Sequence, residues 1–447
     1  MIKSKPRTCL VISSRPPSHS AGLGEDIMNA LRYQGIEVDF LTRYKDKSDT
    51  NNILGVRSIP IIRKFDKIRD SYIVTLLRKL YRRIKPKYSK NTYLTGIEIK
   101  YYDERMPTIP INEVLIKIRK KYDLIITLFW QDMINSSTLK AIYDKQNCPI
   151  LIYAPDMAPM TGGCFYFNKC DRYTKGCGKC PALNSNDVND QTKKNILIKQ
   201  ENYKASNIAF LGNSWMLKHF NSSFLHDSCK QFNVGIVLDE NKFIPFERSQ
   251  RDAIRKHLNF QGDDFIILLR STSEIRKGNN DILKSIELLQ NNYVGGRCIR
   301  IVTVGASYFK DIANIKEISV LDCGQVSTDN LIELFNVADV FISASIDDAG
   351  PSMINQALMC GTPVISYDTG VALDVIKDDI SGYVIDTGNI AQMALKLQNL
   401  ILKEPNEYEI LRKSSRKIAY YNNSKVSFAN KILDIYNQLK ENPKNTK

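Results

Sequence analysis

The sequence predicts an α/β protein built from two doubly wound domains. Three observations favour this class: short β-branched runs alternate with helical segments, the alternation occurs twice, and most runs are continuously apolar. Continuous apolar runs are typical of parallel strands that helices cover on both faces. Strand–helix alternation gives parallel βαβ units. A chain of 447 residues is long enough for two or three such domains.

The first half of the chain contains the runs expected for one parallel sheet. The expected strands are Thr8–Ser14, Ile36–Thr42, Tyr122–Leu128, Pro149–Tyr153 and Asn207–Leu211. A helix is expected over Glu25–Gln34, after a glycine loop at Ser18–Gly24. Strand and helix signals lapse over Asn233–Ser249. We therefore place an N-terminal domain at 1–233, a C-terminal domain at 234–425, and a terminal helix and tail at 426–447.

The second half repeats the pattern. The expected strands are Phe265–Arg270, Ile299–Val304, Val340–Ala344, Pro363–Tyr367 and Tyr383–Ile385. The expected helices are Asp281–Leu289, Asp329–Ala338, Ser352–Met359 and Ala391–Leu402. Ligands of such sheets bind beyond the carboxyl ends of the strands. We therefore expect the two domains to face each other across a ligand-binding cleft.

Composition excludes several classes of protein. No stretch approaches the roughly 20 apolar residues of a membrane-spanning helix. The apolar run near the N-terminus is shorter than the about 7–15 residues of a signal-peptide core. We therefore expect a cytoplasmic protein whose ten cysteines do not form a disulfide framework. The net charge of +15 indicates an anionic partner.

Much of this charge lies in one basic segment, 63–90, which holds eleven Lys or Arg and two Asp. Its apolar residues share one helical face, and a basic amphipathic helix is typical of binding to an anionic membrane surface. The alternative is a helix that packs its apolar stripe on the N-terminal domain. Nucleic-acid binding lacks support because no zinc-finger, helix-turn-helix or RNA-binding pattern appears.

The segment Ser343–Asp386 carries the most specific motif. A strand ends at Ala344, a loop with two carboxylates and Gly350 follows, and a helix starts near Ser352. The free N–H groups of a helix N-terminus favour anions. A generic crossover between two strands is the alternative.

This segment resembles the signature of family-4 retaining glycosyltransferases of GT-B fold. The family has an acidic residue, seven others, then Glu before Ala-Leu/Met-x-x-Gly-x-Pro-Val; this chain has Asp348 and Gln356, followed by Ala357–Val364. The resemblance implies that Asp348 contacts the donor sugar and that Gln356 binds the ribose. It also implies donor contacts from Gly350, Ser352 and Met353. Asp-Asp-Ala-Gly-Pro with Asn-Gln resembles a subgroup of bacterial surface-polysaccharide enzymes.

The resemblance extends to other loops of both domains. Lys277 and Gly278 match the family's Lys-Gly before a helix, which implies that Lys277 and an earlier Arg, Arg270, stabilise the donor diphosphate. Gly324 and Val326 follow a strand near Val320, at the family's base-contacting position, and Gly22 lies in the loop that faces the donor phosphates.

The second cluster of functional residues consists of cysteines in the segment 154–183. Cys164, Cys170, Cys177 and Cys180 have the spacing C-x5-C-x6-C-x2-C. Four cysteines that end in C-x2-C suit a structural Zn²⁺ site. Unliganded thiols, an iron–sulfur centre and disulfides are the alternatives. The other cysteines are scattered and are expected to pack in cores.

The cysteine segment resembles an insertion in the same glycosyltransferase subgroup. Asp156 and Thr161–Cys164 match it, whereas Pro155 and Phe165 replace two histidines. Asp156 is therefore the candidate acceptor-side residue, although an Asx turn explains an Asp there equally well.

The resemblance implies a hexosyltransferase that moves a sugar from a nucleotide-diphosphate donor to a glycan acceptor with retention. The acceptor is expected to be lipid-linked, the protein peripheral on the inner face of the plasma membrane, and catalysis independent of metal. Two alternatives stay open: a non-catalytic nucleotide-sugar-binding paralogue, because Asp348, Gln356 and Pro155 depart from the pattern, and a nucleic-acid-binding protein.

Overall fold

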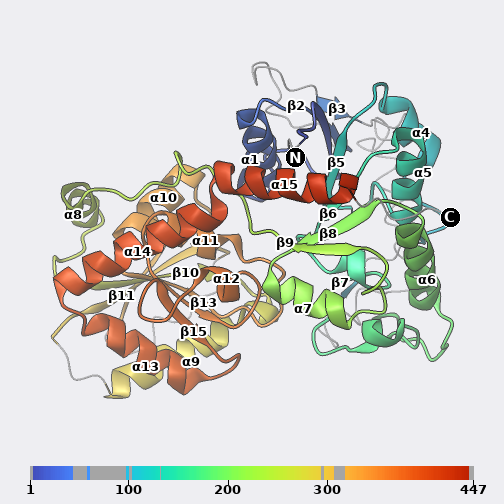
Figure 1. Ribbon diagram of the computed structural model, residues 1–447. Coiled ribbons are helices and arrows are strands. Elements are labelled where there is room, and N and C mark those ends of the chain that lie inside the picture. Colours follow the sequence, from blue (N-terminus) through green and yellow to red (C-terminus); the bar gives the residue numbers. More distant parts are fainter. Residues whose placement is uncertain are drawn as a thin grey trace, which may run out of the picture. The chain divides into compact units, whose positions relative to one another are not determined.

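The computed structural model describes residues 4–43, 58–60, 97–99, 103–130, 132–292, 296–306 and 318–441. The basic segment 63–90 lies outside these ranges. The chain divides into two compact units (Figure 1). The first unit comprises Met1–Gly212, Met216–Val234 and Ala429–Lys447, and the second comprises Asn213–Trp215 and Gly235–Phe428.

The first unit is built on a parallel sheet with the strand order β3-β2-β1-β5-β6-β8-β9 in the described residues. The strands are β1 (Thr8–Ser13), β2 (Glu37–Thr42), β3 (Ser58–Pro60), β5 (Leu124–Leu128), β6 (Ile150–Tyr153), β8 (Ile208–Gly212) and β9 (Lys230–Asn233). The helices are α1 (His19–Tyr33), α4 (Ile111–Lys117), α5 (Ser136–Gln146), α6 (Gln191–Lys204), α7 (Ser214–Ser222) and α15 (Lys425–Glu441). Two short strands, β4 (Glu98–Ile99) and β7 (Cys164–Tyr166), pair separately.

The expected glycine loop at Ser18–Gly24 is wrong, because α1 already begins at His19. The glycines have a different role. Gly22 has a φ of +89°, which favours glycine. A Cβ on Gly24 would lie 2.9 Å from Pro17 Cα, so Gly24 allows the turn after β1 to approach the helix closely.

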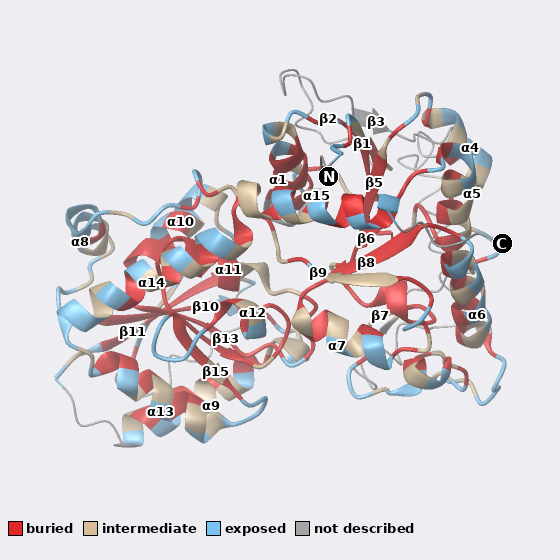
Figure 2. Ribbon diagram, in the orientation of Figure 1, coloured by how far each residue is buried: buried red, intermediate tan, exposed pale blue. Residues whose placement is uncertain are grey.

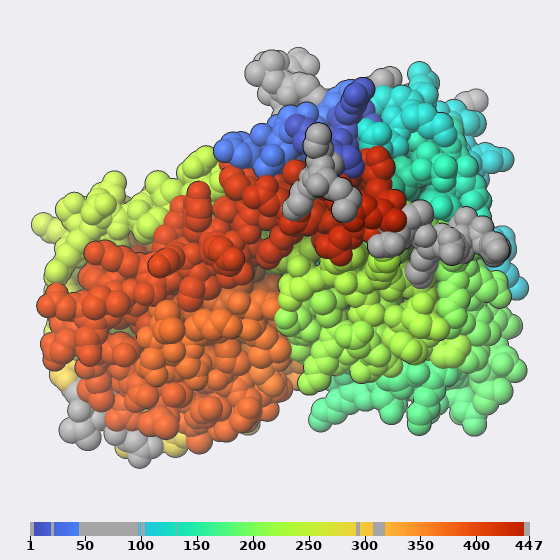
Figure 3. Space-filling model, in the orientation of Figure 1, coloured from blue at the N-terminus to red at the C-terminus, as the bar shows by residue number. Residues whose placement is uncertain are grey.

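Helix α15 completes the first unit with the last described part of the chain. On the visible face of Figure 3, its red residues lie beside the blue N-terminal segment. Ser4 Oγ donates to Asn437 Oδ1 at 3.0 Å, and Asn207 Nδ2 donates to the Leu439 carbonyl at 3.3 Å. The apolar side of α15 is buried, with Ile432 fully so.

The second unit contains a parallel sheet with the order β12-β11-β10-β13-β14-β15. Its strands are β10 (Phe265–Ser271), β11 (Ile299–Gly305), β12 (Ser319–Asp322), β13 (Val340–Ser343), β14 (Val364–Tyr367) and β15 (Gly382–Ile385). Its helices are α8 (Arg248–His257), α9 (Asn279–Asn292), α10 (Thr328–Val337), α11 (Ser352–Met359), α12 (Ala372–Val375), α13 (Ile390–Ile401) and α14 (Pro405–Asn423).

Helices cover both faces of this second sheet (Figure 1). Alternate residues of β10 enter two different cores: Ile267 packs with α9 and α13, whereas Ile266 and Leu268 pack with α10 and α11. Figure 2 shows the strands buried and the outer helix faces exposed. This arrangement explains the continuous apolar runs in the sequence and confirms the predicted doubly wound α/β class.

The order of the strands locates a switch point in each unit. In the second unit the chain moves outward from β10 to β11 and β12, and then returns to the other side with β13. The loops that follow β10 and β13 therefore leave the sheet at the same edge, where open α/β sheets bind ligands. None of the described helices is both long and apolar enough to cross a membrane.

Candidate functional site

Two loops meet at the switch point of the second sheet. The first follows β10 and ends in the short helix η5 (Ile275–Lys277), and the second follows β13 and leads into α11. Because β10 and β13 are paired in parallel, both loops leave the sheet at the same edge. This edge carries most of the residues that the sequence assigned to donor binding.

Backbone contacts lock the two loops together. The Ile346 N–H donates to the Arg276 carbonyl at 2.7 Å. Gly278 has a φ of +65°, and a Cβ there would lie 2.0 Å from the Ala344 carbonyl oxygen. Only glycine fits this position without displacing the second loop. The Asn279 amide closes the first loop by donating to the Thr272 carbonyl at 2.8 Å.

A buried carboxylate faces two cations across these loops. Lys277 Nζ donates to Asp348 Oδ2, and Arg276 Nη1 lies 3.7 Å from the same oxygen. The Asp348 side chain is 5% exposed, and the Gly350 N–H donates to its other oxygen at 3.2 Å. Arg276 also contacts Glu274 at 2.5 Å. Lys277 and Asp348, 71 positions apart in the sequence, therefore form one ionic cluster.

The cluster keeps Asp348 ionised. Burial raises the pKa of Asp348, but the charges of Lys277 and Arg276 and the Gly350 N–H outweigh burial, so the pKa lies below its ordinary value. Asp348 and Glu274 balance the two cations, so an incoming anion binds here by competing with these carboxylates for Lys277 and Arg276.

Helix α11 begins beside this cluster. Its N-terminal flanking residue is Pro351, which makes no side-chain cap, so the first N–H groups of the helix lack that partner. Ser352 and Met353 are half-buried at this end, and Gln356 is buried one turn further on. An uncapped N-terminus stabilises a nearby anion through its N–H groups and the helix dipole.

The remaining predicted donor residues lie along the same edge of the sheet. Arg270 is exposed at the end of β10. The pKa of Lys277 lies below its ordinary value mainly because the lysine is buried, and the charges of Arg276 and Arg270 lower it further. Gly324, with a φ of +60°, follows β12, and its carbonyl accepts from the Gly305 N–H at 2.7 Å. Val326 packs partly buried on the core that α10 and α11 share.

Two of the residues that the sequence assigned to the candidate site belong to the first unit. Asp156 follows β6 and is 7% exposed; its Oδ1 accepts from the Ala158 N–H at 2.9 Å, which is an Asx turn. Gly22 lies in α1. The acceptor-side role of Asp156 stays a prediction.

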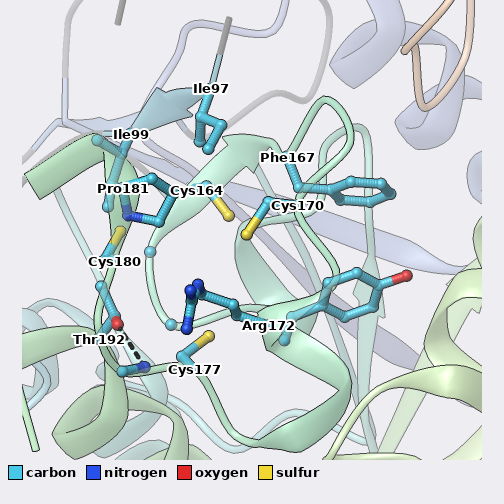
Figure 4. Close-up of a pocket in the computed structure, with 14 residues that line it drawn as sticks. Ile97, Ile99, Cys164, Phe167, Cys170, Arg172, Cys177, Cys180, Pro181 and Thr192 are labelled. Atoms are coloured by element: carbon cyan, nitrogen blue, oxygen red, sulfur yellow. Dashed lines mark hydrogen bonds between the residues drawn. The ribbon is translucent and has the colours of Figure 1, made fainter. Parts of the chain in front are cut away.

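The four clustered cysteines line one pocket in the first unit (Figure 4). All four are free thiols. Within the described ranges, no three Cys, His, Asp or Glu side chains are placed to hold a metal ion as they stand.

Arg276 and Lys199 were not identified from the sequence. Arg276 is adjacent to Lys277, but its contact with Asp348 depends on the approach of a loop 71 positions away. Lys199 is fully buried on α6, 3.6 Å from Glu104, and donates to the carbonyls of Ala158 and Thr161. The polar sequence of α6, QTKKNILIKQENYK, gave no signal that one lysine is buried.

The second unit matches a family of known enzymes. Residues 250–418 match the family model described as "Glycosyl transferases group 1". The putative glycosyltransferase EpsD of Bacillus subtilis is 23% identical over 189 residues, which cover 41% of this chain and 49% of that protein. A Campylobacter jejuni N,N'-diacetylbacillosaminyl-diphospho-undecaprenol alpha-1,3-N-acetylgalactosaminyltransferase is 20% identical over 54% of this chain and 68% of its own length. The chain spans 35–49% of the length of the first three curated relatives.

The whole chain resembles solved glycosyltransferase structures. Sucrose-phosphate synthase from Thermosynechococcus elongatus aligns with a TM-score of 0.64 and 14% identity, over 97% of this chain and 99% of that one. Anabaena Alr3699/HepE in complex with UDP and glucose aligns with a TM-score of 0.60 and 13% identity, over 97% and 100%. The fold is therefore GT-B.

Proposed function

We propose that the protein transfers a sugar from a nucleotide-diphosphate donor to a glycan acceptor, with retention at the anomeric carbon. One observation carries the proposal: Lys277 and Arg276 meet the buried Asp348 at the switch point, beside the uncapped N-terminus of α11. A diphosphate fits this combination of fixed cations and free N–H groups.

The chemistry follows from charge. As the bond between the anomeric carbon and the donor oxygen breaks, negative charge grows on the departing diphosphate. Lys277, Arg276 and Arg270 stabilise that charge, so a catalytic metal is not needed for this task. The diphosphate competes with Asp348 for Lys277, which leaves Asp348 to accept a hydrogen bond from the donor sugar. Gln356 binds a ribose hydroxyl through its amide. The acceptor hydroxyl attacks the anomeric carbon from the face that the diphosphate leaves, and its proton passes to the departing diphosphate oxygen.

We take UDP-sugars as the first donors to test. Structures similar in fold were solved with UDP, with UDP and glucose, and with UDP-glucose. The similar Campylobacter enzyme is named for a diphospho-undecaprenol acceptor. A lipid-linked acceptor at the inner face of the plasma membrane, in cell-surface polysaccharide synthesis, also suits the basic segment 63–90.

A donor panel tests the activity. Purified protein is incubated with UDP-, GDP- and dTDP-sugars with and without lipid-linked acceptors, and nucleotide release is measured. We expect turnover with one donor and a product with the donor's anomeric configuration by NMR. The Lys277→Ala variant should lose about 100-fold in kcat/KM, whereas Lys284→Ala, an exposed lysine on α9, should not. Donor binding without turnover across the panel would instead indicate a non-catalytic nucleotide-sugar-binding protein.

The membrane proposal has its own test. In co-sedimentation, the full chain should bind vesicles that contain phosphatidylglycerol and not vesicles of phosphatidylcholine, and high salt should release it, because charge attraction is screened. Equal binding to both kinds of vesicle, or none to either, contradicts it.

A further inference from the structure

The cysteine pocket lies in a part of the first unit with little regular structure. Between Thr161 and Asp190 the described elements are the three-residue strand β7 and the short helices η3 (Arg172–Lys175) and η4 (Pro181–Leu183). Such a segment has few backbone ladders and a small apolar core, so it needs an additional cross-link to hold one conformation.

The structure nevertheless brings four thiols from three places to one pocket. Cys164 begins β7, Cys170 precedes η3, and Cys177 and Cys180 flank the turn before η4. In Figure 4 the four side chains lie around the pocket, with the Arg172 side chain among them. Ile97, Ile99 and Phe167 supply apolar walls. A pocket of thiols with apolar walls is the surrounding in which structural zinc sites occur.

The turn that carries the closing C-x2-C has an unusual backbone. Gly176, Cys177, Gly178 and Lys179 all have positive φ, with +59° at Cys177 and +46° at Lys179. Two non-glycine residues in this region are strained unless their surroundings hold them. Asp190 and Thr192 hold the turn: Asp190 accepts from the Cys180 N–H at 2.8 Å, and Thr192 accepts from the Gly178 N–H at 3.1 Å.

Polar groups are directed at the sulfur atoms. The N–H groups of Leu183 and Ala182 donate to Cys180, and the N–H of Gly162 donates to Cys177. Burial raises the pKa of both thiols above the ordinary value, and these N–H groups offset it only in part.

The charges around the pocket also match a metal–thiolate centre. Four thiolates and one Zn²⁺ carry a net charge of about −2. Arg172 lies among the thiols, and the buried Lys199 is close enough that Cys177 and Cys164 influence its pKa. Glu104, 3.6 Å away, already balances the charge of Lys199, so Arg172 is the cation that lies with the thiols.

We propose that Cys164, Cys170, Cys177 and Cys180 bind one Zn²⁺ as a structural site that fixes the Cys-rich segment. As they stand the four thiols line the pocket without converging on one point. Occupation therefore requires the four sulfur atoms to approach one another and to release their protons. The site does not depend on the proposed transferase chemistry, which takes place in the second unit.

Metal content and spectroscopy test the site on the full chain. Protein purified anaerobically should contain about one zinc per chain, and a chelator should lower its thermal unfolding midpoint. Replacement of zinc by Co²⁺ should give the intense visible absorption and the sulfur-to-metal charge transfer of tetrahedral thiolate coordination. Because wild-type protein is used, a variant that fails to fold cannot obscure the result.

A matched pair of variants localises the metal. In competition with a chelator, Cys180→Ser should bind zinc at least about tenfold more weakly than wild type. Cys298→Ser, which changes an exposed cysteine of the second unit, should bind zinc with wild-type affinity. Zinc near zero in the wild-type protein, an iron–sulfur chromophore, or a disulfide among the four cysteines by mass spectrometry would overturn the proposal.

Discussion

At the residue scale, the central feature is the buried pairing of Asp348 with Lys277 and Arg276. Asp348 and Lys277 were identifiable from the sequence because each lies in a motif with fixed spacing. Arg276 was not, because its role arises only when the loop after β13 comes within 3.7 Å of its guanidinium. Without a donor, Asp348 occupies the cations that the proposed mechanism assigns to the diphosphate.

The first residue-scale prediction concerns stability. Asp348→Asn leaves a nearly buried lysine, 12% exposed, without its counter-charge. An uncompensated buried charge costs about 3 kcal/mol in the free energy of unfolding. Urea denaturation should show this loss, with the exposed Asp386→Asn as the control. Equal stability of the two variants would mean that the ion pair contributes nothing.

The second residue-scale prediction concerns pH. The pKa of Asp348 is depressed in the folded state, so between that pKa and the ordinary value of about 3.9 the unfolded chain binds more protons. The stabilisation is present above about pH 4 and disappears as the pH falls through the folded-state pKa. Between about pH 5 and about pH 3, wild type should therefore lose more stability than Asp348→Asn. Parallel pH profiles of the two proteins would contradict this.

At the element scale, the buried strands could be predicted from the sequence, whereas an edge strand and the start of one helix could not. Strands such as β10 and β14 were predicted to within one residue, because burial on both faces demands continuous apolar runs. Edge strand β9, with the sequence KQFN, was missed because it is only half-buried and carries no apolar run. The start of α1 was misplaced because its glycines resemble a loop, whereas they serve a close approach of Pro17.

The prediction at this scale concerns the interlocked loops. Gly278→Ala adds a Cβ that would lie 2.0 Å from the Ala344 carbonyl oxygen, at a φ of +65°. The strained backbone and the clash together should lower the free energy of unfolding by more than about 2 kcal/mol. They should also raise the KM for the donor. Gly262→Ala, which has nothing within 4 Å of the added Cβ, should change neither thermal stability nor donor kinetics. A Gly278→Ala variant with wild-type stability and KM would show that the loops are not locked.

At the scale of the whole molecule, the chain returns to its first unit at the end. Helix α15 starts in the second unit, and from Ala429 its residues belong to the first. The sequence predicted a terminal helix and tail but gave no partner for it, since an amphipathic helix does not indicate which sheet it covers. Its buried residues show that the first unit needs the C-terminal part of the chain.

This dependence is testable by truncating a buried side chain. Ile432→Ala removes a fully buried side chain from α15 and should destabilise the first unit by about 2–5 kcal/mol. Gln438→Ala, on the exposed side of the same helix, should leave the unfolding midpoint unchanged. If both variants melt alike, α15 is not part of the core of the first unit.

The central claim is that the edge of the second sheet binds a diphosphate through Lys277, and differential nucleotide binding tests it most directly. Affinities for UDP and for uridine are measured by titration calorimetry on wild type, Lys277→Ala and the control Lys284→Ala. We predict that Lys277→Ala lowers the affinity for UDP at least about tenfold and leaves the affinity for uridine unchanged, because the lysine contacts phosphate and not the nucleoside. UDP binding that Lys277→Ala leaves at the wild-type level would contradict the assignment.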